Sequence, residues 1–96
     1  MLNWVKITRR SQGGGVASES LRADLHGWGV ASIHPHIHHP GEVFLDCPAL
    51  GIDMHPLGKV AAMDALNPAE MVLLRALKEH AVWCLEAMEA IGRAEH

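Results

Sequence analysis

The C-terminal segment from Asn67 to Arg93 constrains the fold of this chain more than any other stretch. Asn67 is a favoured N-cap residue, Pro68 suits the first helical position, and Glu70 stands three residues after Asn67, which is the capping-box spacing. The pattern predicts a helix of about seven turns, from Pro68 to roughly Arg93. The rest of a 96-residue chain must be arranged around this helix.

The apolar face of the predicted helix is wide. At 100° per residue its apolar side chains fill an arc of about 200°, whereas a surface helix needs little more than 100° to cover the core of its own domain. The excess apolar surface predicts that the helix also contacts something other than the core of its own domain. The residues of the arc are Leu73, Leu74, Leu77, Ala81, Trp83, Cys84, Leu85, Ala87, Met88 and Ile91.

Two arrangements can cover this excess apolar surface. In an antiparallel homodimer, two such helices pack across a two-fold axis, and the small Ala81 allows close approach near that axis. In the competing arrangement, the first strand and the first helix wrap the long helix from both sides and bury the arc within one chain. The residues predicted for the dimer interface are Leu74, Ala81, Leu85 and Met88.

Four of the eight histidines fall in one short stretch between Ile33 and Pro40. Side chains alternate between the faces of a strand, so His34, His36 and His38 would share one face. Imidazole is the commonest metal-ligating side chain, and residues two apart on a strand lie close enough for their ring nitrogens to meet on one ion. The alternative is an ordinary amphipathic surface strand whose rings hydrogen-bond to water or to neighbours.

A metal site on this strand would need further ligands, which Cys47 and His55 could supply. Zinc, nickel and copper are the ions that suit several imidazoles with at most one thiolate. The full set of predicted metal ligands is His34, His36, His38, Cys47 and His55.

The histidine strand is predicted to form a hairpin through the turn dipeptide Pro40-Gly41, with residues 42–47 as the returning strand. A two-residue loop would place His34 opposite Cys47, whereas a three-residue loop would place His36 opposite Asp46. A slip of one residue exchanges every cross-strand neighbour, so both registers stay open. Pro35 lacks an amide hydrogen and therefore predicts either a sheet edge or a bulge.

The remaining segments predict an α+β fold in the order strand, helix, strand, strand, helix. A first strand is expected over residues 2–8, and a helix is expected from Ser18 to Gly27 because Leu21 and Leu25 are four residues apart. The segment 48–58 is expected to be an ordered loop with a short strand near Ile52. The prediction is one domain over residues 1–96: a small antiparallel sheet with a short helix and the long C-terminal helix on one face.

Composition limits the environment and the partners. The formal charge of −3 argues against a general nucleic-acid binder. Cys47 and Cys84 form neither a disulfide framework nor a zinc ribbon, so they are expected to be reduced thiols. No apolar signal core precedes Arg9. These features predict a cytoplasmic protein that does not enter a membrane.

The leading functional hypothesis is a small non-enzymatic binding or regulatory protein. It would act as a homodimer, or as an inhibitor or adaptor that docks on a larger protein. The alternative is a transition-metal-binding protein, or a metal-dependent hydrolase, that uses the histidine strand.

Overall fold

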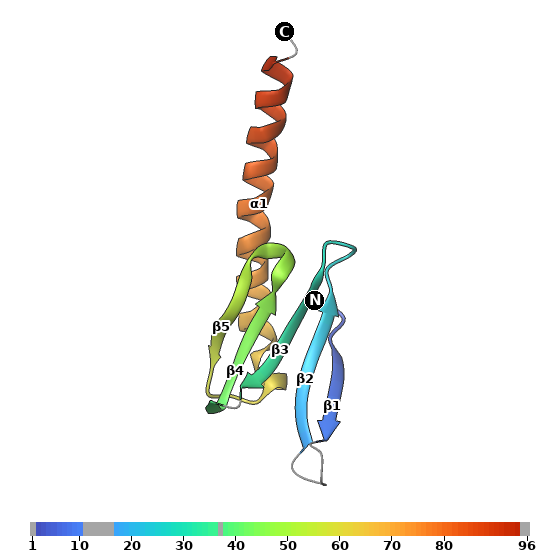
Figure 1. Ribbon diagram of the computed structural model, residues 1–96, viewed down its shortest axis with the longest axis vertical. Helices are drawn as coiled ribbons and strands as arrows, with labels where there is room; N and C mark the ends of the chain where they lie inside the picture. The colour runs from blue at the N-terminus through green and yellow to red at the C-terminus, as the bar shows by residue number, and fades with distance from the viewer. Residues whose placement is uncertain (1, 11–16, 37, 95–96) are drawn as a thin grey trace.

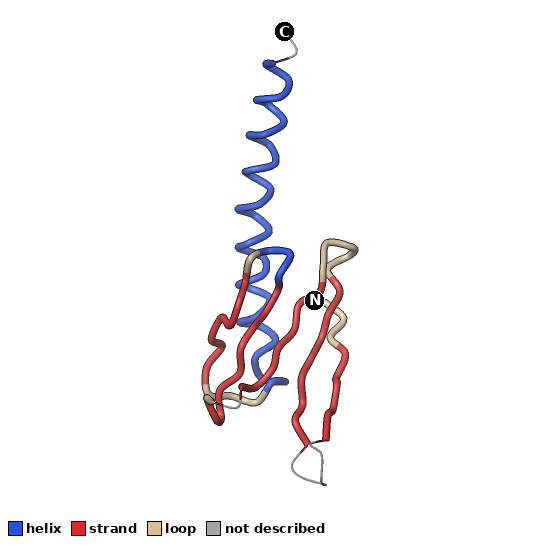
Figure 2. Tube along the Cα trace, viewed as in Figure 1, coloured by secondary structure: helices blue, strands red, loops and turns tan. Residues whose placement is uncertain are grey.

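The computed structural model describes residues 2–10, 17–36 and 38–94 of the chain (Figures 1 and 2). It confirms the α+β class: one antiparallel sheet is combined with one long C-terminal helix. The sheet has five strands that lie in chain order, each paired with the next. The elements are β1 (Val5–Arg10), β2 (Ala17–Asp24), β3 (Val30–His36), β4 (His39–Cys47), η1 (Pro48–Leu50), β5 (Ile52–Gly58), η2 (Ala62–Ala65) and α1 (Leu66–Ala94).

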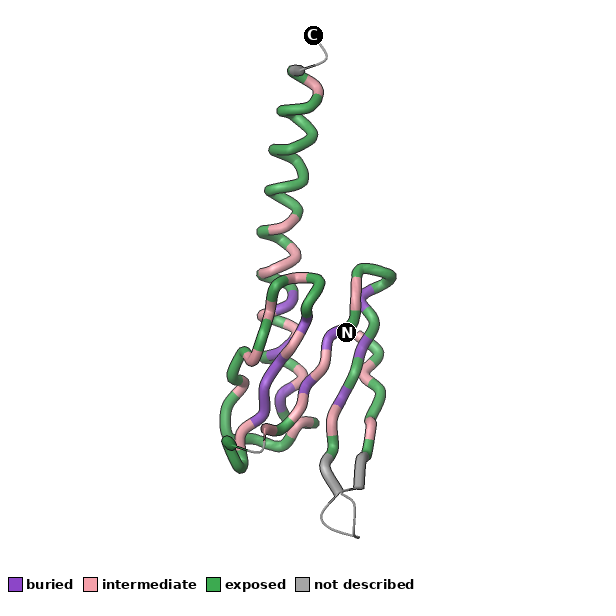
Figure 3. Tube along the Cα trace, viewed as in Figure 1, coloured by how far each residue is buried: buried purple, intermediate pink, exposed green. Residues whose placement is uncertain are grey.

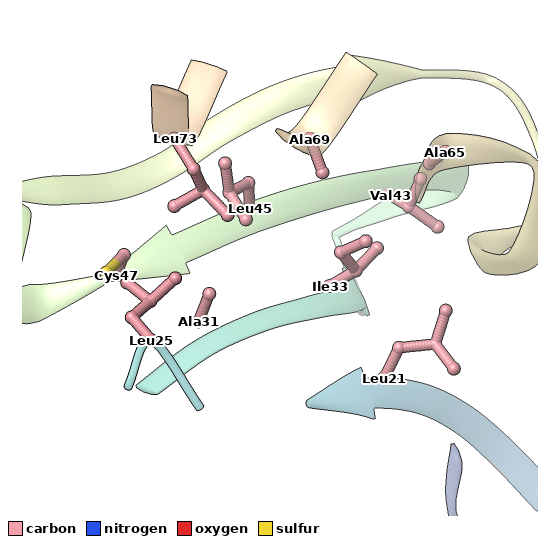
Figure 4. Close-up of a cluster of buried hydrophobic side chains, with 10 residues drawn as sticks. All are labelled: Leu21, Leu25, Ala31, Ile33, Val43, Leu45, Cys47, Ala65, Ala69 and Leu73. Atoms are coloured by element: carbon pink, nitrogen blue, oxygen red, sulfur yellow. The ribbon is translucent and has the colours of Figure 1, made fainter. Parts of the chain in front are cut away.

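The core lies between one face of the sheet and the first turns of α1. Ala65, Ala69 and Leu73 are four residues apart, so they form one stripe, and the two alanines let the helix approach the strands closely (Figure 4). Ile33 and Leu45 face this stripe from the central strands and are fully buried. The core cluster comprises Leu21, Leu25, Ala31, Ile33, Val43, Leu45, Cys47, Ala65, Ala69 and Leu73.

The segment predicted as a first helix is strand β2. The spacing of Leu21 and Leu25 fits one face of a helix, but it also fits alternate positions of a strand. Ala23 between them is equally buried, whereas Arg22 and Asp24 are exposed, so burial alternates with a period of two. Pairing with both β1 and β3 holds the segment extended.

The hairpin of β3 and β4 takes neither predicted register. His34 pairs with Phe44, and the strands are already paired at His36 and His39. The predicted turn dipeptide Pro40-Gly41 lies inside β4, and the register shifts between Pro35 and His36. The bulge predicted from Pro35 is therefore present, and it lies in a central strand, not at a sheet edge.

A glycine permits close packing where β3 begins. Gly29 has a φ of +149°, and a Cβ added there would lie 2.5 Å from the Cβ of Ala49. Only a residue without a side chain fits between the start of β3 and η1.

Helix α1 runs far beyond the sheet (Figures 1 and 3). It begins at Leu66, directly after η2, so Asn67 lies inside the first turn instead of capping it. The whole molecule measures 65 × 25 × 22 Å because the second half of the helix extends past every strand. The arrangement in which other elements wrap the helix from both sides is therefore not adopted. Nowhere in the ranges described is a helix both long and apolar enough to span a membrane.

Candidate functional site

The second half of α1 is an apolar helix without cover from its own chain. Every residue from Ala81 to Ile91 is exposed, and we call this stretch the projecting segment (Figure 3). Its large apolar side chains each keep between 52% and 66% of their surface exposed. They are Val82, Trp83, Leu85, Met88 and Ile91.

An aromatic contact marks the point where the helix leaves the sheet. Trp28, in the turn between β2 and β3, packs edge-on against His80, with ring centroids 4.6 Å apart. Trp83 lies one turn further along α1, with its ring centroid 6.2 Å from that of His80. The histidine is thus engaged by tryptophan rings, and Cys84, four residues later, is exposed. The projecting segment starts directly after this contact.

One stripe of α1 has the spacing of a coiled-coil contact. Six residues follow one another at alternating intervals of three and four, and we call them the seam. Leu74 and Met88 within it are 53% and 66% exposed. The four residues predicted for the interface are all exposed, and three of them belong to the seam while Leu85 flanks it. The seam residues are Leu74, Leu77, Ala81, Cys84, Met88 and Ile91.

The seam continues at its lower end into a groove of about 640 Å³, which we call the base groove. Leu74 and Leu77 belong to both features. The opposite wall comes from the N-terminal segment and the end of β2, and Trp4 holds that segment against the helix by donating a hydrogen bond of 2.9 Å to Glu70. The groove is lined by Leu2, Leu25, His26, Asn67, Glu70, Met71, Leu73, Leu74 and Leu77.

The charged residues of α1 lie mainly on the face turned away from the seam, and each half of that face carries both signs of charge. Arg93 reaches back toward Glu89, with 3.7 Å between the guanidinium and carboxylate groups. The residues of this face are Arg75, Lys78 and Glu79 in the lower half and Glu86, Glu89 and Arg93 in the upper half.

The histidines at the tip of the β3–β4 hairpin form a second feature, the histidine cluster of His36, His38 and His39. The ring centroid of His36 lies 5.4 Å from that of His38 and 5.4 Å from that of His39. The Nδ1 atom of His36 accepts a hydrogen bond of 3.1 Å from the amide of His38. The rings of His36 and His39 also rest against Phe44, which is buried on the sheet face opposite the helix.

His34 is separate from this cluster because it pairs with Asp46. Its Nε2 is hydrogen-bonded to Oδ2 of Asp46, and its Nδ1 lies 3.0 Å from the carbonyl oxygen of Pro35. Both ring nitrogens face an oxygen acceptor, so neither is free to serve as a general base. The pairing of a histidine with Asp46 was expected in one predicted register, but with His36 instead of His34.

Asp46 is held as a carboxylate by its surroundings. Burial favours the neutral acid, but the amide of Met54 donates to Oδ1 at 2.6 Å, and His34 adds a hydrogen bond and its charge. The net effect lowers the pKa of Asp46 below its ordinary value. The pair ties β3 to β4 and β5.

The other two predicted ligands lie away from the histidine rings. Cys47 is fully buried in the core, on the face that α1 covers, and burial raises the pKa of its thiol. His55 is exposed on β5, where its Cα pairs with Leu45. Among the side chains described, no group of three or more histidines, cysteines or acidic residues is arranged to hold a metal ion.

No family model, curated protein or solved structure matches this chain.

Sequence reasoning found the apolar helix face but missed its continuation into a groove. The groove depends on Leu2 and Leu25, which are distant in sequence from the helix, so no local pattern indicates it. His39 was also missed, because strict alternation places it with Ile33 and Ile37. The pairing of His36 with His39 brings it into the cluster.

Proposed function

We propose that this protein is a small non-enzymatic binding or regulatory protein that acts through helix α1. The contact surface is the projecting segment together with the base groove. It serves either a homodimer or docking on a larger protein, as an inhibitor or adaptor does. The observation that carries the proposal is the run of five large apolar side chains exposed between Ala81 and Ile91.

The free energy of apolar burial favours a partner that covers the exposed face of α1. Burying one large apolar side chain contributes about 1.5–3 kcal/mol, and contiguous exposed apolar patches usually mark interaction surfaces. Helices in proteins gain most of their stability from tertiary packing, not from intrinsic propensity. The last turns of α1 receive no such packing from the rest of the described chain. A partner would supply both the burial and the packing.

Sedimentation velocity between about 1 and 100 µM tests the proposal, because such association falls in the range of micromolar dissociation constants. We expect the wild type to exceed its chain mass of 10.4 kDa and to approach twice that mass. Leu85→Glu adds a charge to the surface without touching the core, so it should lower the mass and leave the fold intact. Thr8→Glu, at an exposed position of β1, is the matched control and should behave as the wild type.

Hydrogen exchange measured on the same samples can contradict the proposed function. A monomer whose amides beyond Ala81 exchange as fast as those of an unfolded chain would contradict the proposal, because the surface would not exist in solution. A monomer with a protected helix would favour docking on a different protein.

The alternative function is transition-metal binding, or metal-dependent hydrolysis, at the histidine cluster. The observation that favours it is the equal spacing of the His38 and His39 rings from the His36 ring. Two imidazoles on one tetrahedral ion, with Zn–N bonds of about 2.1 Å, have centroids on the order of 5 Å apart. The side chains of His38 and His39 are exposed and are free to turn toward such an ion.

Calorimetric titration of untagged, metal-free protein with zinc separates this alternative from the main proposal. Binding tighter than about 1 mM that is lost in His36→Ala would support it. His26→Ala removes an exposed histidine outside the cluster and is the control. Equal binding by both variants would end the alternative.

A further inference from the structure

We infer that the partner of α1 is a second copy of this chain, packed antiparallel about a two-fold axis that passes midway between residues 82 and 83. The inference rests on the proposed function, since it names the partner for the same surface. It is carried by the spacing of the seam and by the position of the base groove.

The seam pairs completely with itself in this orientation. In an antiparallel coiled coil, residues at one type of seam position face the other type in the partner helix. Leu74 then lies opposite Ile91 of the second chain, and Leu77 lies opposite Met88. Ala81 lies opposite Cys84 in the two central layers, where these small side chains let the helices approach closely. Every seam residue has a counterpart, and none is left exposed.

The base groove supplies the place for the tip of the second helix. From Leu74 to Ile91 the helix spans about 26 Å at 1.5 Å per residue. The antiparallel pairing therefore brings Ile91 of one chain to the level of Leu74 in the other, at the mouth of the groove. Leu74 and Leu77 line the groove and belong to the seam, so the apolar surface is continuous. The tip that enters it carries Met88 and Ile91, which are 66% and 62% exposed in the single chain.

The sheet does not obstruct this arrangement. It covers α1 on the side of Ala69 and Leu73, and it ends near the start of the projecting segment (Figure 1). Antiparallel packing places the two sheets at opposite ends of the helix pair. Each projecting segment then lies along the lower half of the other helix, where the base groove is open.

The helix dipoles favour the antiparallel orientation over the parallel one, because each positive end meets the negative end of its neighbour.

Cross-linking at two distant seam positions tests the geometry. In a Cys84→Ala background, we introduce Leu74→Cys in one protein and Ile91→Cys in another. The two proteins are unfolded and refolded together, then treated with a short bis-maleimide reagent. We expect cross-linked dimers only in the mixture, each containing one chain of either kind. The Cys84→Ala protein alone is the control for the buried Cys47, and circular dichroism verifies that each variant is folded.

The results that would contradict this inference differ from those that would contradict the proposed function. In the antiparallel dimer the two copies of residue 74 lie about 26 Å apart along the axis, beyond the reach of the reagent. A Leu74→Cys protein that cross-links with itself would therefore show a parallel dimer and overturn the inference. A wild-type dimer by sedimentation whose variants give no cross-link would show that another surface associates, which also overturns it. A wild-type monomer with a protected helix would overturn the inference while leaving docking on a larger protein as the function.

Discussion

At the scale of single residues, Asp46 connects three strands of the sheet. It accepts hydrogen bonds from the amide of Met54 on β5 and from the ring of His34 on β3. These contacts lower the pKa of its carboxyl group in the folded protein. The stability that the carboxylate contributes is therefore present above the unfolded-state pKa, near 3.9, and is lost as pH falls through the lower folded-state value.

We predict that Asp46→Asn lowers the free energy of unfolding by about 1–2 kcal/mol at pH 7, because the amide keeps the shape but loses the charge-assisted hydrogen bonds. The difference from the wild type should shrink below about pH 4, where Asp46 itself becomes neutral. Urea denaturation at both pH values measures this. Asp24→Asn, at an exposed position of β2, should change stability little at either pH. A deficit that persists undiminished at pH 3 would mean that the charge of Asp46 is not what stabilises the sheet.

The alternation of side chains along a strand does not by itself predict which histidines of this chain could share a metal ion. Alternation predicts that His34, His36 and His38 share one face of the strand. The cross-strand pairing then assigns His34 to Asp46 and joins His36 to His38 and His39. Which imidazoles meet depends on the register of β3 and β4, which shifts between Pro35 and His36.

At the scale of elements, α1 is one helix with two different roles. Its first turns carry Ala69 and Leu73, which extend the core stripe begun by Ala65 of η2, whereas its later turns carry the seam. The two stripes overlap in position only near Leu73 and Leu74, which are adjacent in sequence. Leu73 is 1% exposed and Leu74 is 53% exposed. Substitution of Leu73 should therefore affect mainly folding, and substitution of Leu74 should affect mainly association.

We predict that Leu73→Ala lowers the free energy of unfolding by about 2–5 kcal/mol, because it leaves a cavity in the core. Leu74→Ala makes the same chemical change one residue later and should weaken self-association while leaving the stability of the single chain nearly unchanged. Thermal denaturation at low concentration and sedimentation at high concentration measure the two effects. Equal destabilisation by both substitutions, with no change in mass, would place the seam inside the core of one chain.

At the scale of the whole molecule, the elongated shape follows from a sheet that is shorter than its helix. The sheet and the lower half of α1 bury a continuous core, and the projecting segment extends from it with its apolar surface exposed (Figure 3). In the antiparallel dimer each projecting segment lies along the lower half of the other helix, and the long shape of the single chain becomes a helix pair with a sheet at either end.

The sequence by itself determined the features that arise from local chemistry. The long C-terminal helix followed from helix-favouring residues over many consecutive turns, and its excess apolar surface followed from their spacing. The α+β class followed from strand-like segments in the first half of the chain. The start of the helix was predicted to within two residues, at Pro68 against the observed Leu66.

The tertiary structure alone decided the features that depend on residues far apart in sequence. Leu21 and Leu25 fit a helix or a strand equally well, and only pairing of β2 with β1 and β3 makes the segment extended. The register of the histidine hairpin, the pair of His34 with Asp46 and the base groove all require two segments to meet at one position. Hydrophobic periodicity reports which face of an element is apolar, but not what covers that face. The sheet ends before the helix does, and that relation between two separate elements is what leaves the projecting segment exposed.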